Sequence, residues 1–187
     1  LRGSVSVRTV AVIGSGTMGS GIAQVCAQTG WETRLYDAFP ESLDKGMNSI
    51  DEFWKSGIRR GKNTEEQVKD WSEKLVPCEN LEEALSGVDL VIEAVPEKID
   101  LKRSIFQKIE ELAPENAILA TNTSGLRISE IASVVKNPER VVGMHFFNPV
   151  PIMKLLELVK HDSCSDNTIE MAKAAGEAMG KTTILVK

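Results

Sequence analysis

The sequence predicts an α/β fold with a doubly wound sheet that is mostly parallel, ends in antiparallel strands and carries a projecting helical arm. Three observations predict it. Residues 10–13 are an apolar, β-branched run that leads directly into a Gly-x-Gly-x-x-Gly turn over residues 14–19. Short apolar runs then alternate with helical patterns, which is typical of parallel strands buried on both faces. No flexible linker interrupts the pattern, so residues 1–187 are expected to form one Rossmann-type domain.

The glycine turn is expected to bind the pyrophosphate of a dinucleotide. Gly14 allows the tight turn, Gly16 lets the backbone approach a pyrophosphate, and Gly19 lets the next helix lie close to the strand. The free N–H groups at the start of that helix favour a phosphate. The turn residues predicted to bind the cofactor are Gly14, Ser15, Gly16, Thr17, Met18 and Gly19.

A second strand, over residues 32–36, ends in Asp37, eighteen residues after Gly19. A carboxylate there can accept both hydroxyls of the adenosine ribose and would repel a 2′-phosphate. We therefore expect NAD(H) and not NADP(H). The alternative is a tight turn without a ligand and an ordinary solvated Asp. The agreement of strand, glycines, helix and acid in order and spacing favours the cofactor.

Composition and charge argue against several classes of protein. The net charge of −5 is unfavourable for nucleic acid as the main partner. No apolar run approaches the roughly 20 residues that span a bilayer, and no signal-peptide pattern opens the chain, so no membrane contact is expected. The first four residues lack a Met and are set aside as a remnant of cloning.

The chain has three cysteines, at positions 26, 78 and 164, and none of their spacings is that of a metal or redox site. We therefore expect reduced thiols and no metal. This favours a cytoplasmic protein, or one of the mitochondrial matrix if a transit peptide has been removed.

The helices of the first half are marked by apolar periodicity. The helix after the glycine turn has one apolar face and ends at Gly30. Pro40 begins a long polar helix, and residues 63–66 start another that runs to about Leu75. This insertion, about residues 40–75, is too long for a plain crossover and is predicted to project as a helical arm. Its basic residues form either a solvated face or, less often, a receptor for an anionic ligand such as a nucleotide phosphate.

Five further strands are predicted, over residues 88–95, 117–120, 141–144, 155–159 and 182–186. Regularly spaced Leu and Ile predict a helix over residues 101–112, and a small-residue helix over 166–179 ends at Gly180. Only a few residues around Pro149 join the third and fourth of these strands. Such a short connection requires an antiparallel turn.

Polar side chains gather where two of these strands end. Thr-Asn-Thr-Ser follows one at residues 121–124, and His-Phe-Phe-Asn-Pro follows another at 145–149. Ligands of open α/β sheets bind outside the carboxyl ends of the strands, on the same edge as the glycine turn. Ser124 and His145 are therefore expected to reach the nicotinamide end of a bound dinucleotide. The other histidine, His161, lies in a polar turn and is interpreted as incidental.

Glu157 interrupts the apolar run of residues 155–159. A buried carboxylate needs a cationic or hydrogen-bonding partner, and His145 is one if the two strands are neighbours. The alternative is an edge strand from which Glu157 points to solvent. A carboxylate behind an imidazole fixes its tautomer and supports its positive charge. Such a pair can take a proton from an alcohol while hydride leaves its carbon.

These motifs, in fixed order from about Arg8 to Lys187, resemble the NAD-binding domain of L-3-hydroxyacyl-CoA dehydrogenases. The 3-hydroxybutyryl-CoA dehydrogenases of the same family are equally similar. The segments that carry the resemblance are residues 14–19, 92–97, 121–124, 145–149 and 155–159. The resemblance implies oxidation of an L-3-hydroxyacyl-CoA to the 3-ketoacyl-CoA with reduction of NAD, in fatty-acid β-oxidation or 3-hydroxybutyryl-CoA metabolism.

The resemblance also implies roles for single residues. His145 is the general base and Glu157 its orienting carboxylate. Ser124 hydrogen-bonds the reacting oxygen, with Asn148 in support. The residues it places at the nicotinamide half of NAD are Glu97, Lys102 and Ser124.

The resemblance further implies that the arm covers the CoA moiety of an acyl-CoA substrate. The match is loose there, so Ser49, Lys55 and Arg59 are only weak candidates for CoA contacts. Family members continue with a Pro-Gly-Phe segment that contains a further active-site Asn, and then with an all-helical domain. That domain closes the acyl site and forms most of a homodimer contact. The domain is expected as a partner, on the same chain or in trans, and residues 1–187 alone are expected to be poorly active.

Two alternatives to the function that the resemblance implies remain. One is a related dehydrogenase of a hydroxy acid or sugar acid without CoA, like the lambda-crystallin branch. Poor binding of free CoA together with turnover of a sugar acid would select it. The other is a non-catalytic NAD(H)-binding protein, which the presence of His145, Ser124 and Glu157 argues against.

Overall fold

The computed structural model of the chain describes residues 6–123 and 126–187. The strands of these residues are β1 (Thr9–Ile13), β2 (Glu32–Tyr36), β3 (Leu75–Cys78), β4 (Leu90–Glu93), β5 (Ile118–Thr121), β6 (Val141–Phe146), β7 (Leu155–Val159) and β8 (Thr182–Val186). The helices are α1 (Thr17–Gln28), α2 (Pro40–Arg59), α3 (Glu65–Lys74), α4 (Leu81–Leu85), α5 (Ile99–Leu112), α6 (Ile128–Ala132), the 3-10 helix η1 (Pro138–Arg140) and α7 (Asp166–Ala178).

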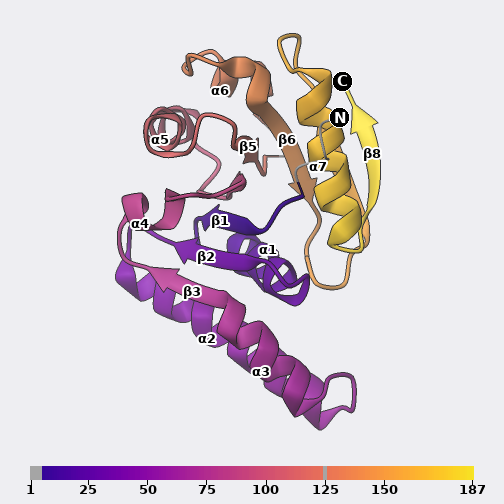
Figure 1. Cartoon of the computed structure of the whole chain (residues 1–187). Coiled ribbons are helices and arrows are strands. Elements are labelled where there is room, and N and C mark those ends of the chain that lie inside the picture. Colours follow the sequence, from indigo (N-terminus) through magenta and orange to yellow (C-terminus); the bar gives the residue numbers. More distant parts are fainter. Residues whose placement is uncertain (1–5, 124–125) are drawn as a thin grey trace.

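All the strands belong to one sheet in the order β3-β2-β1-β4-β5-β6-β7-β8 (Figure 1). Neighbouring strands are parallel except β6 and β7, which are antiparallel. This confirms the predicted doubly wound sheet with an antiparallel step near its end. The chain winds outwards from β1 in one direction and from β4 in the other. That reversal opens a crevice at the carboxyl ends of β1 and β4, where ligands bind in sheets of this class.

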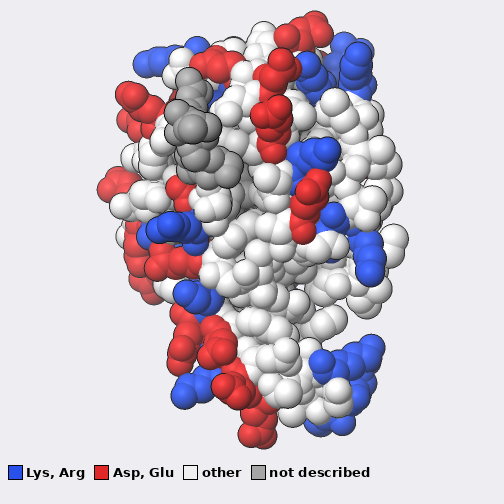
Figure 2. Space-filling view, turned by 45° about the vertical axis from the view of Figure 1, so that its right-hand side comes forward, with Lys and Arg blue, Asp and Glu red and all other residues white. Residues whose placement is uncertain are grey.

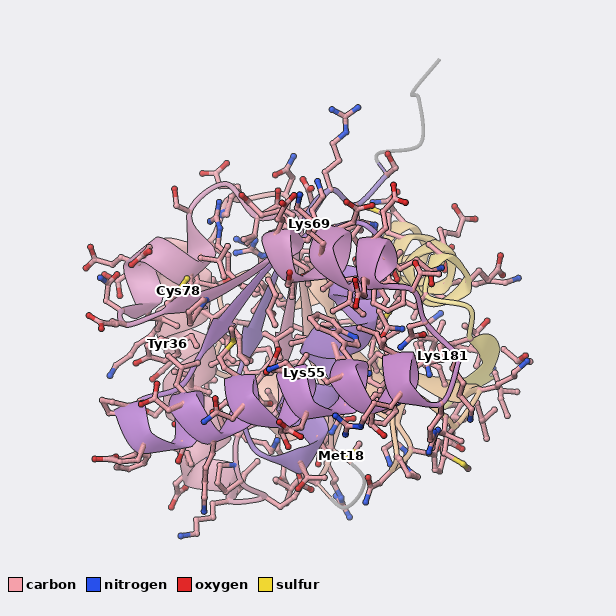
Figure 3. The ribbon with its side chains drawn as sticks, turned by 90° about the horizontal axis from the view of Figure 1, so that it is seen from below. Met18, Tyr36, Lys55, Lys69, Cys78 and Lys181 are labelled. Carbon is pink, nitrogen blue, oxygen red and sulfur yellow. The ribbon has the colours of Figure 1, made fainter. Side chains whose placement is uncertain are left out.

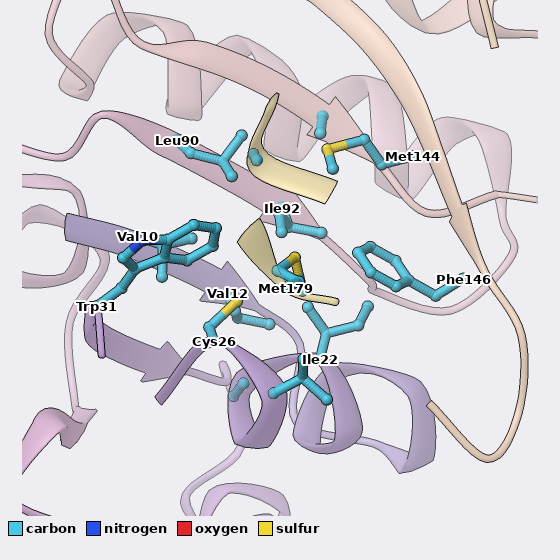
Figure 4. Packing of buried hydrophobic residues seen from close by; sticks show 14 of the residues in the cluster. Val10, Val12, Ile22, Cys26, Trp31, Leu90, Ile92, Met144, Phe146 and Met179 are labelled. Carbon is cyan, nitrogen blue, oxygen red and sulfur yellow. The ribbon is translucent and has the colours of Figure 1, made fainter. Parts of the chain in front are cut away.

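Helices cover both faces of the sheet, and each face has its own apolar core. Alternate residues of β1 point to opposite faces, so Val10 and Val12 pack with α1, α2 and α7 (Figure 4). Ala11 and Ile13 pack with α4, α5 and α6 on the other face. Burial on both faces is the reason why the strands are continuous apolar runs and not alternating ones.

The predicted helical arm is present. Helices α2 and α3 lie side by side and project beyond the sheet (Figures 1 and 3). Ile50 and Trp54 bury one side of α2, and the Trp54 ring lies 5.8 Å from the ring of Trp71 on α3. The turn between the helices exposes Arg59, Arg60 and Lys62, which form a basic group at the end of the arm (Figure 2). No helix among the described residues is long and apolar enough to cross a membrane.

Several details differ from the prediction: the strand expected over residues 88–95 spans only Leu90–Glu93, and α4 and α6 lie where no helix was predicted. The helix expected to run to about Leu75 ends at Lys74, and the short strand β3 begins at Leu75. Pro77 lies in that strand, which a proline tolerates because β3 is at the edge of the sheet. Strand β6 also extends to Phe146, two residues beyond the predicted end, so that His145 lies within the strand.

The three cysteines are free thiols with buried side chains. Burial raises the pKa of each thiol, to about 11 for Cys78, because a thiolate is disfavoured away from water. The cysteines are thus unpaired, as expected.

Candidate cofactor and active site

A cavity of about 980 Å³ lies at the carboxyl ends of β1, β2, β4, β5 and β6. It is lined by every predicted glycine-turn residue except Gly19. Asp37, Glu97, His145 and Asn148 also line it. Residues far apart in the sequence thus meet in one cavity because parallel strands end at the same edge of the sheet.

The glycine turn has the form that a dinucleotide requires. Gly14 has a φ of +107°, and a Cβ on it would lie 2.7 Å from the carbonyl oxygen of Ala94. A Cβ on Gly19 would lie 1.8 Å from the carbonyl oxygen of Gly14. Gly16, the N-cap of α1, has open space where a Cβ would be, and no side chain caps the helix. The first N–H groups of α1 are therefore available to a pyrophosphate.

Two glycine substitutions should separate folding from cofactor binding. Gly19→Ala drives a methyl group into a backbone carbonyl, so we expect the free energy of unfolding to fall by about 3 kcal/mol or more. Gly16→Ala meets no atom and should change stability by less than about 1 kcal/mol. The new methyl group should nevertheless lower NADH affinity about tenfold or more, by filling space that a pyrophosphate needs. Urea unfolding and NADH titration measure the two effects. If the two variants changed the free energy of unfolding and the NADH affinity by equal amounts, this interpretation of the turn would be wrong.

Asp37 is held in place by its own neighbours. Its Oδ2 accepts hydrogen bonds from the backbone N–H and from the hydroxyl of Ser15, each at 2.8 Å. Its Oδ1 accepts one from the backbone N–H of Phe39 at 2.9 Å. The carboxylate is thereby fixed at the end of β2, on the wall of the cavity. Ser15, predicted to contact the cofactor, has a buried side chain that orients Asp37.

His145 and Glu157 form the pair that the sequence predicts. They are directly opposite each other in the antiparallel register of β6 and β7. The His145 Nδ1 lies 2.8 Å from Oε1 of Glu157. Because a carboxylate only accepts, Nδ1 is the nitrogen that carries the hydrogen in this contact, and Nε2 is the nitrogen left for a substrate. The ring is also stacked at an angle against Phe147, with 4.5 Å between the ring centroids.

Asn122 holds the strand ends together, a role that its sequence position does not reveal. Its backbone N–H donates to the carbonyl of Glu93 at 2.8 Å, and its Oδ1 accepts from the backbone N–H of Phe146 at 2.9 Å. Asn122 therefore joins the ends of β4, β5 and β6 around the cavity that it also lines.

A buried ion pair supports one wall of the cavity. Oε2 of Glu93 accepts from Nζ of Lys102 and from the N–H of Val95, each at 2.7 Å. Oε1 of Glu93 accepts from the hydroxyl of Thr121 at 2.6 Å. Burial raises the pKa of the Glu93 carboxyl, and the nearby Lys102 ammonium opposes that rise. Every one of these partners is a donor, so the arrangement suits a carboxylate ion.

Lys102 is a correction to the predicted cofactor contacts. Its side chain has no exposed surface, so it cannot touch a ligand in the cavity. It lies behind Glu97 instead, with Nζ 3.1 Å from Oε1 of Glu97. The other oxygen of Glu97 accepts from the hydroxyl of Thr123 at 2.7 Å. Glu97 itself is 45% exposed and lines the cavity.

The apolar side of α5 is divided between core and cavity. Phe106 and Ile109 are fully buried in the core, whereas Leu101 and Leu112 are exposed and line the cavity. The spacing of these residues predicts the helix correctly, but the sheet covers only part of its apolar surface. The remainder gives the cavity an apolar wall.

A second, smaller cavity of about 150 Å³ adjoins the first, because Thr17 and Asn148 line both. Ser49 and Phe53 of α2 form its other wall. The weak candidates Lys55 and Arg59 are exposed on α2, and neither is among the described residues that line the two cavities. The Lys55 ammonium pairs with Asp51 at 2.8 Å, and this contact raises its pKa.

The turn that carries Asn148 is held by a buried lysine. Nζ of Lys181 donates to the carbonyl oxygens of Val150 and Met153, at 2.5 and 2.7 Å. Burial lowers the pKa of this lysine. Lys181 precedes β8 directly, so the start of the last strand fixes the turn between β6 and β7.

The remaining predictions fall outside the cavity or outside the described residues. Ser124 lies outside the residues that the structure describes. Nε2 of His161 donates to the carbonyl of Val141 at 2.8 Å, away from both cavities, which agrees with the interpretation of this histidine as incidental to the site. Over residues 6–123 and 126–187, no group of three or more His, Cys, Asp or Glu is placed to hold a metal ion.

Residues 9–187 match the family model described as "3-hydroxyacyl-CoA dehydrogenase, NAD binding domain". A probable 3-hydroxyacyl-CoA dehydrogenase of Caenorhabditis elegans is 40% identical, and the match covers 97% of this chain and 62% of the relative. A probable 3-hydroxybutyryl-CoA dehydrogenase of Bacillus subtilis is also 40% identical, with 97% and 63% covered. The crystal structure of 3-hydroxybutyryl-CoA dehydrogenase from Escherichia coli K12 superposes with a TM-score of 0.94 at 41% identity, and covers 97% of this chain and 38% of that one. The chain thus spans less than two thirds of the length of these relatives.

Proposed function

We propose, because this chain belongs to the 3-hydroxyacyl-CoA dehydrogenase family through its NAD-binding domain, that it is part of an enzyme that oxidises L-3-hydroxyacyl-CoA to 3-ketoacyl-CoA. The observation that carries the proposal is the His145–Glu157 pair at the edge of a cavity of about 980 Å³ that the glycine turn and Asp37 also line. The matching family model is that of an NAD-binding domain. The cavity contains the glycine turn, which would bind the pyrophosphate of NAD, and Asp37, which would bind its adenosine ribose.

The order of the strands sets the direction in which the cofactor lies. Asp37 at the end of β2 would hold the adenosine ribose, and the glycine turn after β1 would hold the pyrophosphate. The nicotinamide half would then lie over the ends of β4, β5 and β6, where Glu97 and His145 line the cavity. When bound there, NAD supplies the acceptor for a hydride.

The residues of the chain supply the acid–base part of the reaction. Nε2 of His145 accepts the hydroxyl proton of the substrate, because Nδ1 is occupied by Glu157. Glu157 orients the ring and stabilises the imidazolium that forms. Proton transfer of this kind contributes typically about 10²–10⁴-fold to the rate.

The smaller cavity suggests where the rest of the substrate lies. It opens from the main cavity at Asn148, close to His145, and runs between the turn after β6 and the α2 residues Ser49 and Phe53. We assign this smaller cavity to the acyl-CoA, with Asn148 at the point where the two cavities meet. The arm would then cover the CoA moiety, and its exposed basic end would lie in the region of the CoA phosphates.

The test uses an extended chain, in which residues 1–187 are joined to the part that follows the matched region in the Bacillus subtilis relative. NADH formation is measured with 3-hydroxyacyl-CoAs of graded acyl length, and with a sugar acid as the alternative substrate. Oxidation of the CoA substrates supports the proposal. Turnover of the sugar acid alone would overturn it.

Asp37 should select the cofactor. We expect NADH to bind far more tightly than NADPH, because the carboxylate accepts from the ribose hydroxyls and repels a 2′-phosphate. Asp37→Ala should weaken NADH binding by about tenfold or more and leave NADPH binding much less changed. Quenching of the tryptophan fluorescence reports both affinities.

Ser15→Ala is the matched control for this prediction. It removes the hydroxyl bond to Asp37 but keeps the carboxylate, so the preference for NADH should persist. Equal affinities of the unmodified chain for NADH and NADPH would contradict the assignment of Asp37.

A further inference from the structure

Lys181, labelled in Figure 3, is a buried lysine whose ammonium group binds a single turn of the chain. Its Nζ donates to the carbonyl oxygens of Val150 and Met153, at 2.5 and 2.7 Å. Over residues 6–123 and 126–187, no carboxylate forms an ion pair with it. A buried ammonium is costly without a counter-charge, and here two backbone carbonyls are its partners. The contact therefore constrains the turn and does not serve to pair charges.

The turn transmits this constraint to Asn148. The backbone N–H of Met153 donates to the carbonyl of Pro149 at 2.9 Å, so a residue that Lys181 binds is bonded to the neighbour of Asn148. Val150, the other residue that Lys181 binds, lies against a glycine of α1, with its Cβ 3.0 Å from where a Cβ on that glycine would be. The backbone that follows Asn148 is thus held at two points.

We propose that Lys181 is a positioning residue for the substrate: by binding both carbonyls of the turn, it sets the place of Asn148 where the two cavities meet. Asn148, Pro149 and Val150 line the smaller cavity, which is assigned above to the acyl-CoA. His145 and Asn148 both line the main cavity, so a movement of this wall would shift an acyl-CoA relative to the proposed base. The glycine turn lies on another strand and would stay in place. This inference rests on the proposed function, since it requires the acyl-CoA to occupy the smaller cavity.

Steady-state kinetics of the extended chain with 3-hydroxybutyryl-CoA and NAD⁺ test the proposal. Lys181→Met removes both hydrogen bonds and keeps much of the bulk of the side chain. It should raise the KM for 3-hydroxybutyryl-CoA about tenfold and leave the KM for NAD⁺ within about twofold. A smaller folded fraction would lower only the apparent kcat and would change neither KM. Lys154→Met, which changes an exposed lysine of the same turn, is the matched control and should leave both KM values within about twofold.

A double-mutant cycle tests whether Lys181 acts through Asn148. Asn148→Ala alone should lower kcat/KM for 3-hydroxybutyryl-CoA about tenfold, because it removes the amide at the point where the two cavities meet. In that background, Lys181→Met should lower kcat/KM by less than about twofold further, since the group that it positions is already gone. Independent effects of the two substitutions would instead multiply to about a hundredfold.

Lys181→Gln replaces Lys181→Met in the cycle if the Met variant fails to fold, because an amide can still donate to a carbonyl. An unchanged KM for the CoA substrate, an equal rise in both KM values, or multiplying effects in the cycle would overturn the role of Lys181 and leave the proposed function intact. Loss of NADH binding in both Lys181 variants would also overturn it, because the lysine would then be needed for the fold as a whole. If the unmodified extended chain oxidised no 3-hydroxyacyl-CoA, the proposed function itself would be overturned.

Discussion

Substitution of His145 by Gln is expected to reduce the turnover of the extended chain by about 10²–10⁴-fold, because it removes the proposed base for the substrate proton. NADH affinity should stay within about twofold, since Gln fills a similar space on the cavity wall. Glu157→Gln should also reduce turnover, because the amide no longer fixes the proton on Nδ1 of His145. Steady-state kinetics with 3-hydroxybutyryl-CoA and NADH titration measure the two quantities.

His161→Gln is the matched control. This second histidine is buried and bonded to the carbonyl of Val141, away from both cavities, so its loss should affect stability and not turnover. Equal losses of turnover in the His145 and His161 variants would show that the first loss has a structural cause. Full turnover by Glu157→Gln would mean that Glu157 is not the functional partner of His145.

The 187-residue chain by itself is expected to bind NADH and yet to turn over acetoacetyl-CoA at least about 10³-fold more slowly than the extended chain. The glycine turn, Asp37 and the His145–Glu157 pair all lie within one folded sheet, so cofactor binding needs nothing further. The smaller cavity, assigned above to the substrate, has a volume of only about 150 Å³, and the part that follows in the relatives is expected to complete the substrate site. Loss of positioning can remove several kcal/mol of barrier reduction, and about 1.4 kcal/mol corresponds to a factor of ten.

Adding the part that follows in the relatives, in trans or on the same chain, should restore the activity. The exposed side chains of Ile184, Leu185 and Val186 on β8 also suggest that the 187-residue chain self-associates, which light scattering would detect. If the 187-residue chain turned over acetoacetyl-CoA at the rate of the extended chain, the part that follows in the relatives would not be needed for catalysis. That result would contradict the prediction.

Much of this site follows from the sequence because its parts are local or depend on simple chain geometry. The glycine turn and Asp37 are set by neighbours within one strand–helix–strand unit, so spacing alone predicts them. The His145–Glu157 pair lies twelve residues apart, across a turn too short for anything but antiparallel strands. A buried carboxylate within an apolar run requires a partner, and His145 is one because the two strands are neighbours.

The contacts that the sequence left undecided are those whose partners come from separate elements. The resemblance places Lys102 at the nicotinamide half of NAD, yet its side chain is buried and pairs with Glu93, on a strand beneath α5. The apolar periodicity of α5 predicts a helix but not which apolar residues face the core, and Leu101 and Leu112 line the cavity instead. A sequence pattern reports the conformation of a segment. Which side of it is covered, and which charge is paired, depends on what the rest of the chain packs against it.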